Sequence, residues 1–300
     1  MFNTARLLES KGHQVAFFSM EHGMNINSEW SRFFVKNVEY NTKHSMIEQL
    51  RIAANTLYSA EAETKISDLV DYFKPDIAHL YNFHHQLTPS ILSALKRKHV
   101  PMVMTLNDYK LVCPSYTMLK GGELCEMCKG KRFYYCLLTR CLKGSLSKSL
   151  VAMIESYLHH QILNSYRPID CFICPSEFIL RKAREMGLAG NFIHLPHFLN
   201  IDEYRSDYAG KENSIIYFGR LSKEKGLFTL IEAMKGIKGA TLKIIGDGPL
   251  RSDMERRVKG LELDNVHFLG YKIGEDLKSE IRSSLFAVVP SEWYEVLAWS

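Results

Sequence analysis

The chain has 300 residues, of which 46% are hydrophobic and 24% charged, and its formal net charge is +5. This composition indicates a packed globular protein with room for two domains of ordinary size. The small positive charge suits an anionic ligand or a membrane surface, but it is too weak to indicate nucleic-acid binding.

No apolar run approaches the roughly 18 to 20 residues that are needed to cross a bilayer. The chain opens on an amphipathic pattern without the basic start of a signal peptide. Its seven cysteines are an odd number and read better as cytosolic thiols than as a disulfide framework. We therefore expect a cytoplasmic protein, in one alternative a peripheral one at the inner face of the membrane.

Short apolar runs alternate with helical patterns along the chain. The runs are mostly continuous, as in parallel strands that are covered on both faces. Helices are expected at Ser145–Ser165, with an apolar residue at every fourth position, and directly after Gly226. This alternation predicts a doubly wound α/β architecture. The expected strands are Gln14–Ser19, Asp76–Tyr81, Met102–Leu106, Asp170–Cys174, Ser214–Gly219, Leu242–Ile245, Val266–Leu269 and Leu285–Val289.

The polar stretch Asn200–Asn213 is the expected domain boundary, because it holds few apolar residues and contains Gly210. The sequence thus predicts one α/β domain over residues 1–199 and a second over 200–300. The first domain carries a Cys-rich insertion at about residues 113–141.

A basic segment, Tyr217–Gly226, follows an expected strand and leads into a helix. Arg220, Lys223 and Lys225 lie within six residues of one another. Arg220 can bind two oxygens at once, and free N–H groups at a helix start add partial positive charge. A diphosphate fits this chemistry, whereas a solvated surface turn is the plain alternative.

Two further segments follow the ends of expected strands. Gly246-Asp247-Gly248-Pro249 would let backbone approach a ligand closely, and Pro290–Glu295 offers a carboxylate for sugar hydroxyls. Each alone is more often an ordinary turn or a surface carboxylate. In open α/β sheets, however, ligands bind beyond the carboxyl ends of the strands, so three such segments together indicate one site.

These three segments resemble the donor-site motifs of family 4 glycosyltransferases, which are retaining enzymes with the two-domain GT-B fold. Glu9-Ser10-Lys11-Gly12-His13-Gln14-Val15, Asp76–Leu92 and Cys171–Phe178 resemble N-terminal segments of the same family. The resemblance implies two Rossmann-like domains. Both would be incomplete, lacking a first strand and the C-terminal part.

The resemblance also implies roles for particular residues. Arg220 and Lys225 would hold the donor diphosphate and stabilise the leaving nucleotide, and Glu295 would face the donor sugar. Transfer would then need no metal or other cofactor besides the nucleotide-sugar donor, and the chain contains no Asp-x-Asp pair. The implied donor-binding residues are Gly219, Arg220, Lys225, Gly246, Gly248, Ser291 and Glu295.

The sequence departs from the family pattern at two places. Asn107 stands where the family usually carries a His near the transfer site, and Asn cannot titrate near neutrality. A second Glu, eight positions after Glu295, would fall at position 303. These departures leave an alternative open, an inactive fragment that keeps the fold without catalysis.

Five cysteines fall between Cys113 and Cys141. A structural zinc site formed by Cys125, Cys128, Cys136 and Cys141 has plausible spacing, and unliganded or redox-labile thiols are the alternative. A Cys-rich, metal-dependent nucleic-acid-binding module is a further reading, which nothing in the second domain supports.

The insertion also mixes basic and aromatic side chains over Lys129–Lys148. This segment could dock on anionic lipid, which suits a lipid-linked acceptor, or it could be a solvated basic loop. The leading hypothesis is a retaining hexosyltransferase that acts on a glycan or lipid-linked acceptor in surface polysaccharide or glycolipid assembly, with no nucleic-acid partner.

Overall fold

The computed structural model describes residues 1–37, 52, 54–84, 86–201 and 211–297. The chain divides into two compact units. The first comprises Met1–Gly121 and Cys125–His197, and the second comprises Gly122–Leu124 and Phe198–Ser300. The division thus falls next to His197, just before the polar stretch in which the sequence places it; most of that stretch lies outside the described residues.

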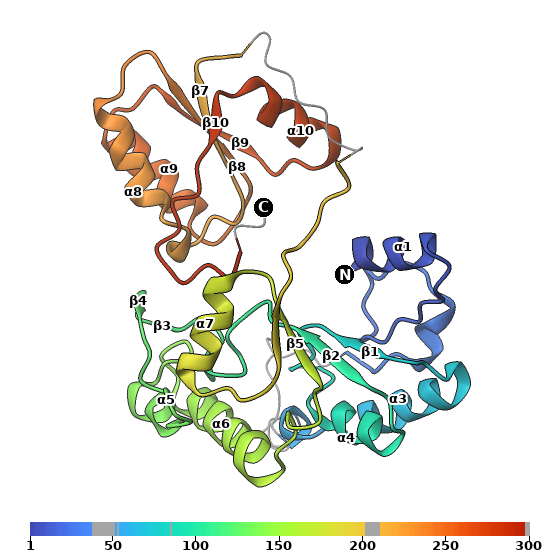
Figure 1. Ribbon diagram of the computed structural model, residues 1–300. Coiled ribbons are helices and arrows are strands. Elements are labelled where there is room, and N and C mark those ends of the chain that lie inside the picture. Colours follow the sequence, from blue (N-terminus) through green and yellow to red (C-terminus); the bar gives the residue numbers. More distant parts are fainter. Residues whose placement is uncertain (38–51, 53, 85, 202–210, 298–300) are drawn as a thin grey trace. The chain divides into compact units, whose positions relative to one another are not determined.

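The first unit is built on a four-stranded sheet in the order β1-β2-β5-β6 (Figure 1). All three strand pairings are parallel. Helices α3 and α4 pack against each other, and α7 connects β5 to β6. The strands and helices are β1 (Ala78–Leu80), β2 (Met102–Thr105), β5 (Cys171–Cys174), β6 (Phe192–His194), α3 (Ala60–Phe73), α4 (Ser90–Arg97) and α7 (Glu177–Met186).

Local signals set the limits of these helices. The Ser176 hydroxyl accepts a hydrogen bond from the N–H of Ile179 and caps α7 at its start. The helix ends at Gly187, whose φ of 102° is left-handed and is tolerated best by glycine. Ser59 caps α3 in the same way, by accepting from the N–H of Ala62.

The other elements before β5 are mostly short, and of those that the structure describes all except β4 belong to the first unit. Two of them, β3 and β4, form a two-stranded sheet within the Cys-rich insertion, and α6 continues into a π-helical turn, η2. These elements are α1 (Phe2–Ser10), η1 (Glu29–Phe33), β3 (Leu119–Lys120), β4 (Glu123–Leu124), α5 (Tyr134–Thr139), α6 (Leu146–Tyr157) and η2 (Leu158–Ile162).

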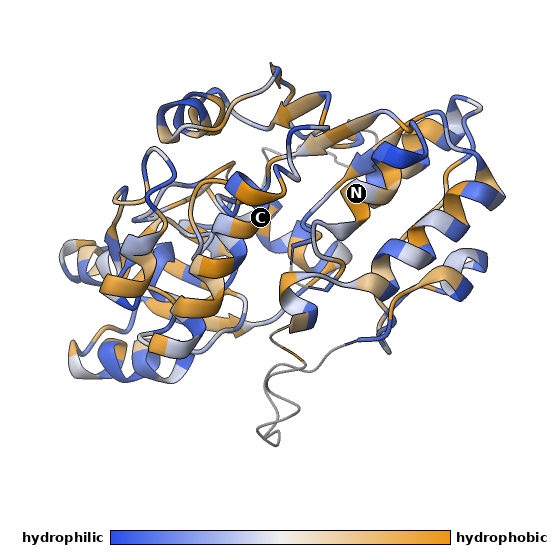
Figure 2. Cartoon of the chain, turned by 90° about the horizontal axis from the view of Figure 1, so that it is seen from below, coloured by the Kyte–Doolittle hydropathy of each residue, from blue (hydrophilic) through white to orange (hydrophobic). Residues whose placement is uncertain are grey.

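The second unit has a parallel sheet in the order β10-β7-β8-β9. Helices α8 and α9 lie on one side of this sheet and α10 on the other (Figure 1). Ile216, Leu227 and Leu242 are fully buried, and along the helices hydrophobic and hydrophilic residues alternate (Figure 2). The elements are β7 (Ser214–Phe218), η4 (Lys223–Lys225), α8 (Leu227–Ala233), η5 (Met234–Gly236), β8 (Thr241–Ile245), α9 (Arg251–Gly260), β9 (Val266–Gly270), α10 (Gly274–Ser283) and β10 (Phe286–Ala287).

Two sequence expectations about the elements are wrong. Residues 14–19 form no strand, because pairing there is limited to one parallel bridge between Met20 and Val35; an apolar run becomes a strand only where a neighbour satisfies its N–H and C=O groups. The helix expected over Ser145–Ser165 leaves α-helical geometry after Tyr157. The three-residue strand β6 was not predicted.

Both four-stranded sheets are parallel and helices flank them, so the fold is the doubly wound α/β architecture that the alternation of elements predicts. None of the helices in the described ranges combines the length and the apolar character of a membrane-spanning segment.

Candidate functional site

In the second unit, three neighbouring parallel strands end at one edge of the sheet. The basic segment follows β7, the glycine segment follows β8, and Pro290–Glu295 follows β10. Because β7 lies between β8 and β10, the basic segment lies between the other two. The carboxyl ends of a parallel sheet are the usual place for a ligand.

The basic and glycine segments are joined by backbone contacts. The N–H of Gly219 donates to the carbonyl of Ile245 at 2.9 Å, and the N–H of Leu221 donates to that of Asp247 at 2.9 Å. A Cβ at Gly246 would collide with the Gly219 carbonyl, and one at Gly248 with the Leu221 carbonyl. Both glycines are therefore required by the close approach of two chain segments, whether or not a ligand is bound.

Lys225 and Glu295 form the centre of the site. The Lys225 Nζ lies 3.0 Å from both carboxylate oxygens of Glu295. Trp293 donates from its Nε1 to the same carboxylate at 2.6 Å, and its ring centroid lies 5.4 Å from the Lys225 ammonium. About a fifth of each charged side chain is exposed, 21% for Lys225 and 22% for Glu295, so the pair is half-buried and still open to solvent.

Arg220 does not share this partner. Its guanidinium pairs with Glu224, and its Nε donates to the Ser222 hydroxyl at 3.2 Å. The Arg220 side chain is 64% exposed. The structure thus brings Lys225 and Glu295 together and leaves Arg220 on the solvent side of the same turn.

Ser291 lies in the loop between β10 and Glu295. Its hydroxyl is buried and has no hydrogen-bond partner among the residues that the structure describes. Since buried polar groups are nearly always bonded, this hydroxyl is suited to a ligand. Sequence reasoning missed Trp293, although an aromatic residue two positions before a candidate carboxylate was a visible signal.

Residues 201–300 match the family described as Glycosyl transferases group 1. This third of the chain is therefore similar to that glycosyltransferase family. The match covers the whole of the region that carries the three segments.

Two curated relatives are glycosyltransferases by name. The lipopolysaccharide core biosynthesis glycosyltransferase LpsE of Rhizobium meliloti is 26% identical over 117 residues, which are 37% of this chain and 34% of the relative. The D-rhamnosyltransferase WbpZ of Pseudomonas aeruginosa is 34% identical over 175 residues, which are 51% of this chain and 45% of the relative. The matches thus span less than half the length of each relative.

A solved structure shares the fold. The Anabaena protein Alr3699/HepE, in complex with UDP and glucose, superposes with a TM-score of 0.54 at 15% identity. The superposition covers 78% of this chain and 58% of that one. The likeness shows that this chain has the Rossmann-like GT-B fold.

In the first unit, Asn107 follows the end of β2. Its Oδ1 lies 3.1 Å from Nε2 of His197, which lies three residues beyond β6 and would donate this hydrogen bond. The neighbouring Asp108 has a pKa that burial raises, although the N–H of Lys110 donates to it. A histidine thus lies beside the position where the family pattern expects one. Sequence reasoning missed His197 because it did not predict β6.

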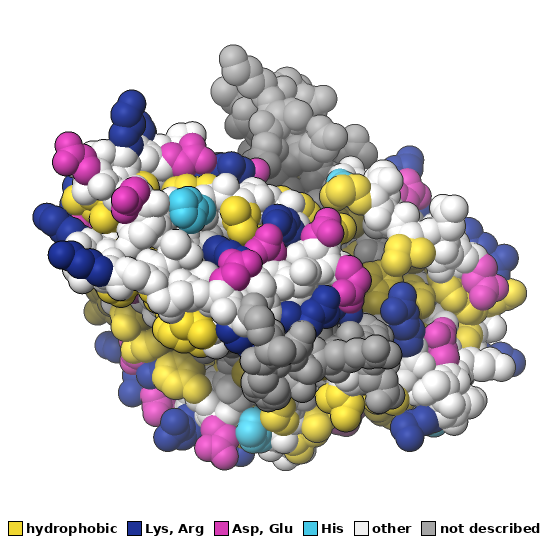
Figure 3. All heavy atoms as spheres, turned by 90° about the horizontal axis from the view of Figure 1, so that it is seen from above, with side chains coloured by type: hydrophobic (Ala, Val, Ile, Leu, Met, Phe, Trp, Pro, Cys, Tyr) yellow, Lys and Arg dark blue, Asp and Glu magenta, His cyan; other side chains and the backbone are white. Residues whose placement is uncertain are grey.

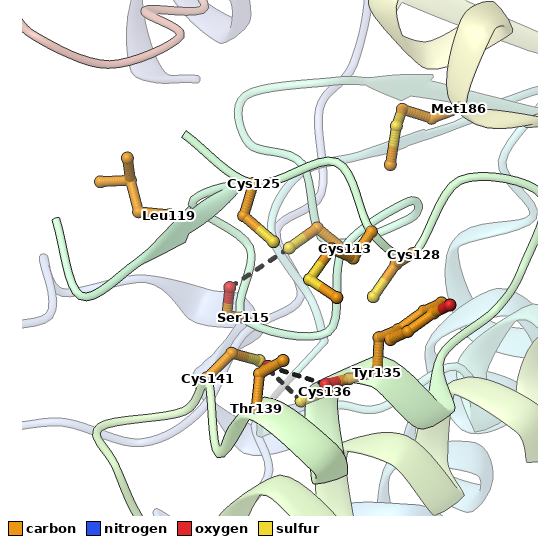
Figure 4. Close-up of a pocket in the computed structure, with 11 residues that line it drawn as sticks. Cys113, Ser115, Leu119, Cys125, Cys128, Tyr135, Cys136, Thr139, Cys141 and Met186 are labelled. Carbon is orange, nitrogen blue, oxygen red and sulfur yellow. Dashed lines mark hydrogen bonds between the residues drawn. The ribbon is translucent and has the colours of Figure 1, made fainter. Parts of the chain in front are cut away.

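The cysteines of the insertion gather around one cavity (Figure 4). Cys125, Cys128, Cys136 and Cys141, which the sequence proposes as zinc ligands, are joined there by Cys113. All seven cysteines are free thiols. As the side chains stand, no group of three or more His, Cys, Asp or Glu within the described ranges is arranged to hold a metal ion.

Charged side chains of both signs are interspersed on the face that Figure 3 shows, with Lys and Arg next to Asp and Glu. This mixture agrees with the small net charge of +5. Nucleic-acid binders gather Lys and Arg on one face, so the face shown gives no support to the nucleic-acid-binding alternative.

Proposed function

We propose that this protein is a glycosyltransferase that moves a hexose from a nucleotide-sugar donor to a glycan or lipid-linked acceptor, with retention of configuration. The observation that carries the proposal is the Lys225–Glu295 pair, half-buried at the edge where three parallel strands end. One cation for a diphosphate and one carboxylate for sugar hydroxyls are the two groups that a nucleotide sugar requires.

The chemistry proposed for Lys225 is electrostatic. Negative charge grows on the diphosphate as the glycosidic bond breaks, and a fixed ammonium stabilises it without a divalent metal. Before the donor binds, Glu295 holds the ammonium in place at 3.0 Å. Arg220 would leave Glu224 to reach the phosphates, because its own side chain is 64% exposed and solvent weakens such an ion pair.

The glycines and Ser291 would complete the donor site. Gly219, Gly246 and Gly248 keep side chains away from the strand ends, so backbone can approach the nucleotide. The buried hydroxyl of Ser291 would bond to the donor. Asn107 and His197 would face the acceptor side, with Asn107 as a hydrogen-bonding rather than a titrating group.

The names of the relatives support a surface polysaccharide or glycolipid as the product. One relative builds lipopolysaccharide core and another transfers D-rhamnose, and the superposed structure holds UDP and glucose. We therefore propose a role in surface polysaccharide or glycolipid assembly on the cytoplasmic side of the membrane.

Replacing the central cation tests the donor site. Lys225→Ala should weaken the binding of the best nucleotide sugar by about tenfold to a hundredfold, because a charge-assisted hydrogen bond contributes about 1.5–3 kcal/mol. The measurement is titration calorimetry with a panel of nucleotide sugars, followed by product analysis. Lys235→Ala, at an exposed lysine of η5, is the matched control. Equal affinity in the two variants would refute the donor assignment; binding without transfer would favour the inactive alternative.

A peripheral membrane contact is proposed for α6. Leu146, Leu150 and Ile154 recur every fourth residue and are 52%, 39% and 41% exposed, so they form an apolar stripe. Lys148 lies on the same helix, and Arg140 and Lys143 precede it. An apolar stripe beside basic residues is the pattern of a helix that binds anionic lipid.

Vesicle binding tests this contact. The chain should sediment with phosphatidylglycerol vesicles, less so as salt rises, and weakly with phosphatidylcholine. Leu146→Gln with Leu150→Gln should reduce binding severalfold, whereas Ile273→Gln, at another exposed apolar residue, should leave it unchanged. Binding that ignores both lipid charge and the α6 substitutions would dismiss the proposal.

A further inference from the structure

The Cys-rich insertion holds five thiols around a cavity of about 10 Å³. They come from separate places in the chain: Cys113 follows β2, Cys125 follows β4, Cys128 precedes α5, and Cys136 and Cys141 lie in and just after α5. Such a volume holds one water or one ion. Sulfur and carbon make up most of its lining, so a water there would find few partners.

Two hydroxyl groups of the lining are already engaged. The Ser115 hydroxyl lies 3.2 Å from the Cys113 Sγ, and the Thr139 hydroxyl donates to the Tyr135 carbonyl at 2.7 Å. Soft thiolate sulfur is the preferred ligand of zinc. A single thiophilic ion therefore suits this cavity better than water does.

The backbone around the cavity gives an independent argument. Between residues 116 and 143, five non-glycine residues have left-handed φ values: Tyr116, Met118, Lys131, Arg140 and Lys143. Each costs about 1 kcal/mol or more. The regular elements of this stretch are two strands of two residues and one helix of six. Short, strained elements of this kind need a cross-link to hold them, and the seven cysteines form no disulfide.

We propose that Cys113, Cys125, Cys128 and Cys141 bind one Zn²⁺ as four thiolates. Binding forms four Zn–S bonds and releases four thiol protons to solvent. The resulting charge of −2 lies within a segment rich in Lys and Arg, including Lys129, Lys131 and Arg132, which offsets it. The site is independent of the proposed transferase function.

Cys136 is the one thiol of these five that is not a zinc ligand in this proposal. Its Sγ lies 2.8 Å from the Cys141 Sγ, whereas two sulfurs on a tetrahedral zinc are about 3.8 Å apart. Cys136 is also buried against α6, where its thiol donates to the Ser149 carbonyl at 3.8 Å. The four ligand side chains would close on the ion by changes of side-chain rotamer, and the half-buried Cys141 would turn away from Cys136.

The test is the zinc content of the full chain, purified without chelator and measured by elemental mass spectrometry. We expect about one zinc per chain, and Co²⁺ exchanged into the same protein should show the thiolate-to-metal charge-transfer and ligand-field bands of a tetrahedral site. Cobalt spectroscopy on the unmodified chain needs no variant to fold.

Cysteine-to-serine variants locate the ligands. Cys113→Ser, Cys125→Ser, Cys128→Ser and Cys141→Ser should each lose most of the zinc or weaken the cobalt charge-transfer band. Cys136→Ser should keep the metal. Cys171→Ser and Cys174→Ser are matched controls, because they have the same Cys-x2-Cys spacing but lie in β5, with Cys174 buried and Cys171 half-buried.

Three results would overturn the proposal. One is a folded, reduced chain that contains no zinc and gives no cobalt bands. Another is a peptide mass that lacks two hydrogens across Cys136 and Cys141 in metal-free protein, which would assign the pair to a disulfide. The third is zinc that survives loss of Cys113 but not of Cys136.

Discussion

At the scale of single residues, the candidate site is shaped by glycines as much as by charges. Gly246 has a φ of 135°, and a Cβ added to it would collide with the carbonyl of Gly219. A side chain at this position would force β7 and β8 apart at their carboxyl ends. The same substitution would move Lys225 relative to the glycine segment. The packing of the strand ends and the binding of a ligand therefore both depend on the absence of a Cβ at Gly246.

Gly246→Ala should therefore lower the free energy of unfolding by at least about 2 kcal/mol, from the left-handed backbone and the collision together. Urea denaturation followed by circular dichroism measures the loss. Gly236→Ala is the control, because a Cβ at Gly236 meets nothing within 4 Å; its effect should stay within about 0.5 kcal/mol. A neutral Gly246→Ala would show that the two strand ends are not in close contact.

At the scale of elements, α6 is tied to the loop that carries Asn107. Glu155 of α6 accepts a hydrogen bond from the Lys110 ammonium at 2.5 Å, and both side chains are at most 5% exposed. Lys110 also donates to the Pro114 carbonyl at 3.4 Å. The inner face of α6 thus holds the Asn107 loop through a buried ion pair, while its outer face presents the apolar stripe.

Breaking this pair from one side should be costly. Glu155→Leu leaves the Lys110 charge buried, and we expect a loss of about 3–5 kcal/mol in the free energy of unfolding. Glu155→Leu with Lys110→Met removes both charges and should recover much of that loss. A double-mutant cycle by urea denaturation measures the coupling. If the double variant were as unstable as the single one, the cost would come from packing and not from the charge.

At the scale of the whole molecule, each unit has its own sheet and core. Within the part of the chain that the structure describes, the core of the second unit, with Leu227 and Leu242, is formed by residues of that unit. All residues of the proposed donor site belong to the second unit. A nucleotide that binds there should therefore stabilise the second unit.

A bound nucleotide should therefore protect one unit selectively. At about 100 times its dissociation constant it stabilises the folded state by about 2.7 kcal/mol. Hydrogen-exchange mass spectrometry should show slower exchange in β7, β8 and the three segments that follow the strand ends, and unchanged exchange in α3 and α4. Protection confined to the first unit would move the donor site there.

The sequence by itself determined the class of fold and the order of the candidate segments. Apolar runs alternating with amphipathic helices require a parallel sheet, because each strand must be covered on both faces. Ser176 and Gly187 set the ends of α7 through local hydrogen bonding and backbone geometry. These signals act over a few residues, so the chain alone reveals them.

Only the tertiary structure decided which side chains meet. Lys225 reaches Glu295 across 70 residues, whereas Arg220 turns to Glu224, and nothing local distinguishes the two cations. His197 meets Asn107 because β2 and β6 end at the same edge of the sheet. Cys113 lines the same cavity as the other thiols, although it is not part of the spacing pattern that suggested a zinc site. The missing strand at residues 14–19 has the same cause. Contacts between distant segments depend on how the sheet is assembled, which periodicity in the sequence does not encode.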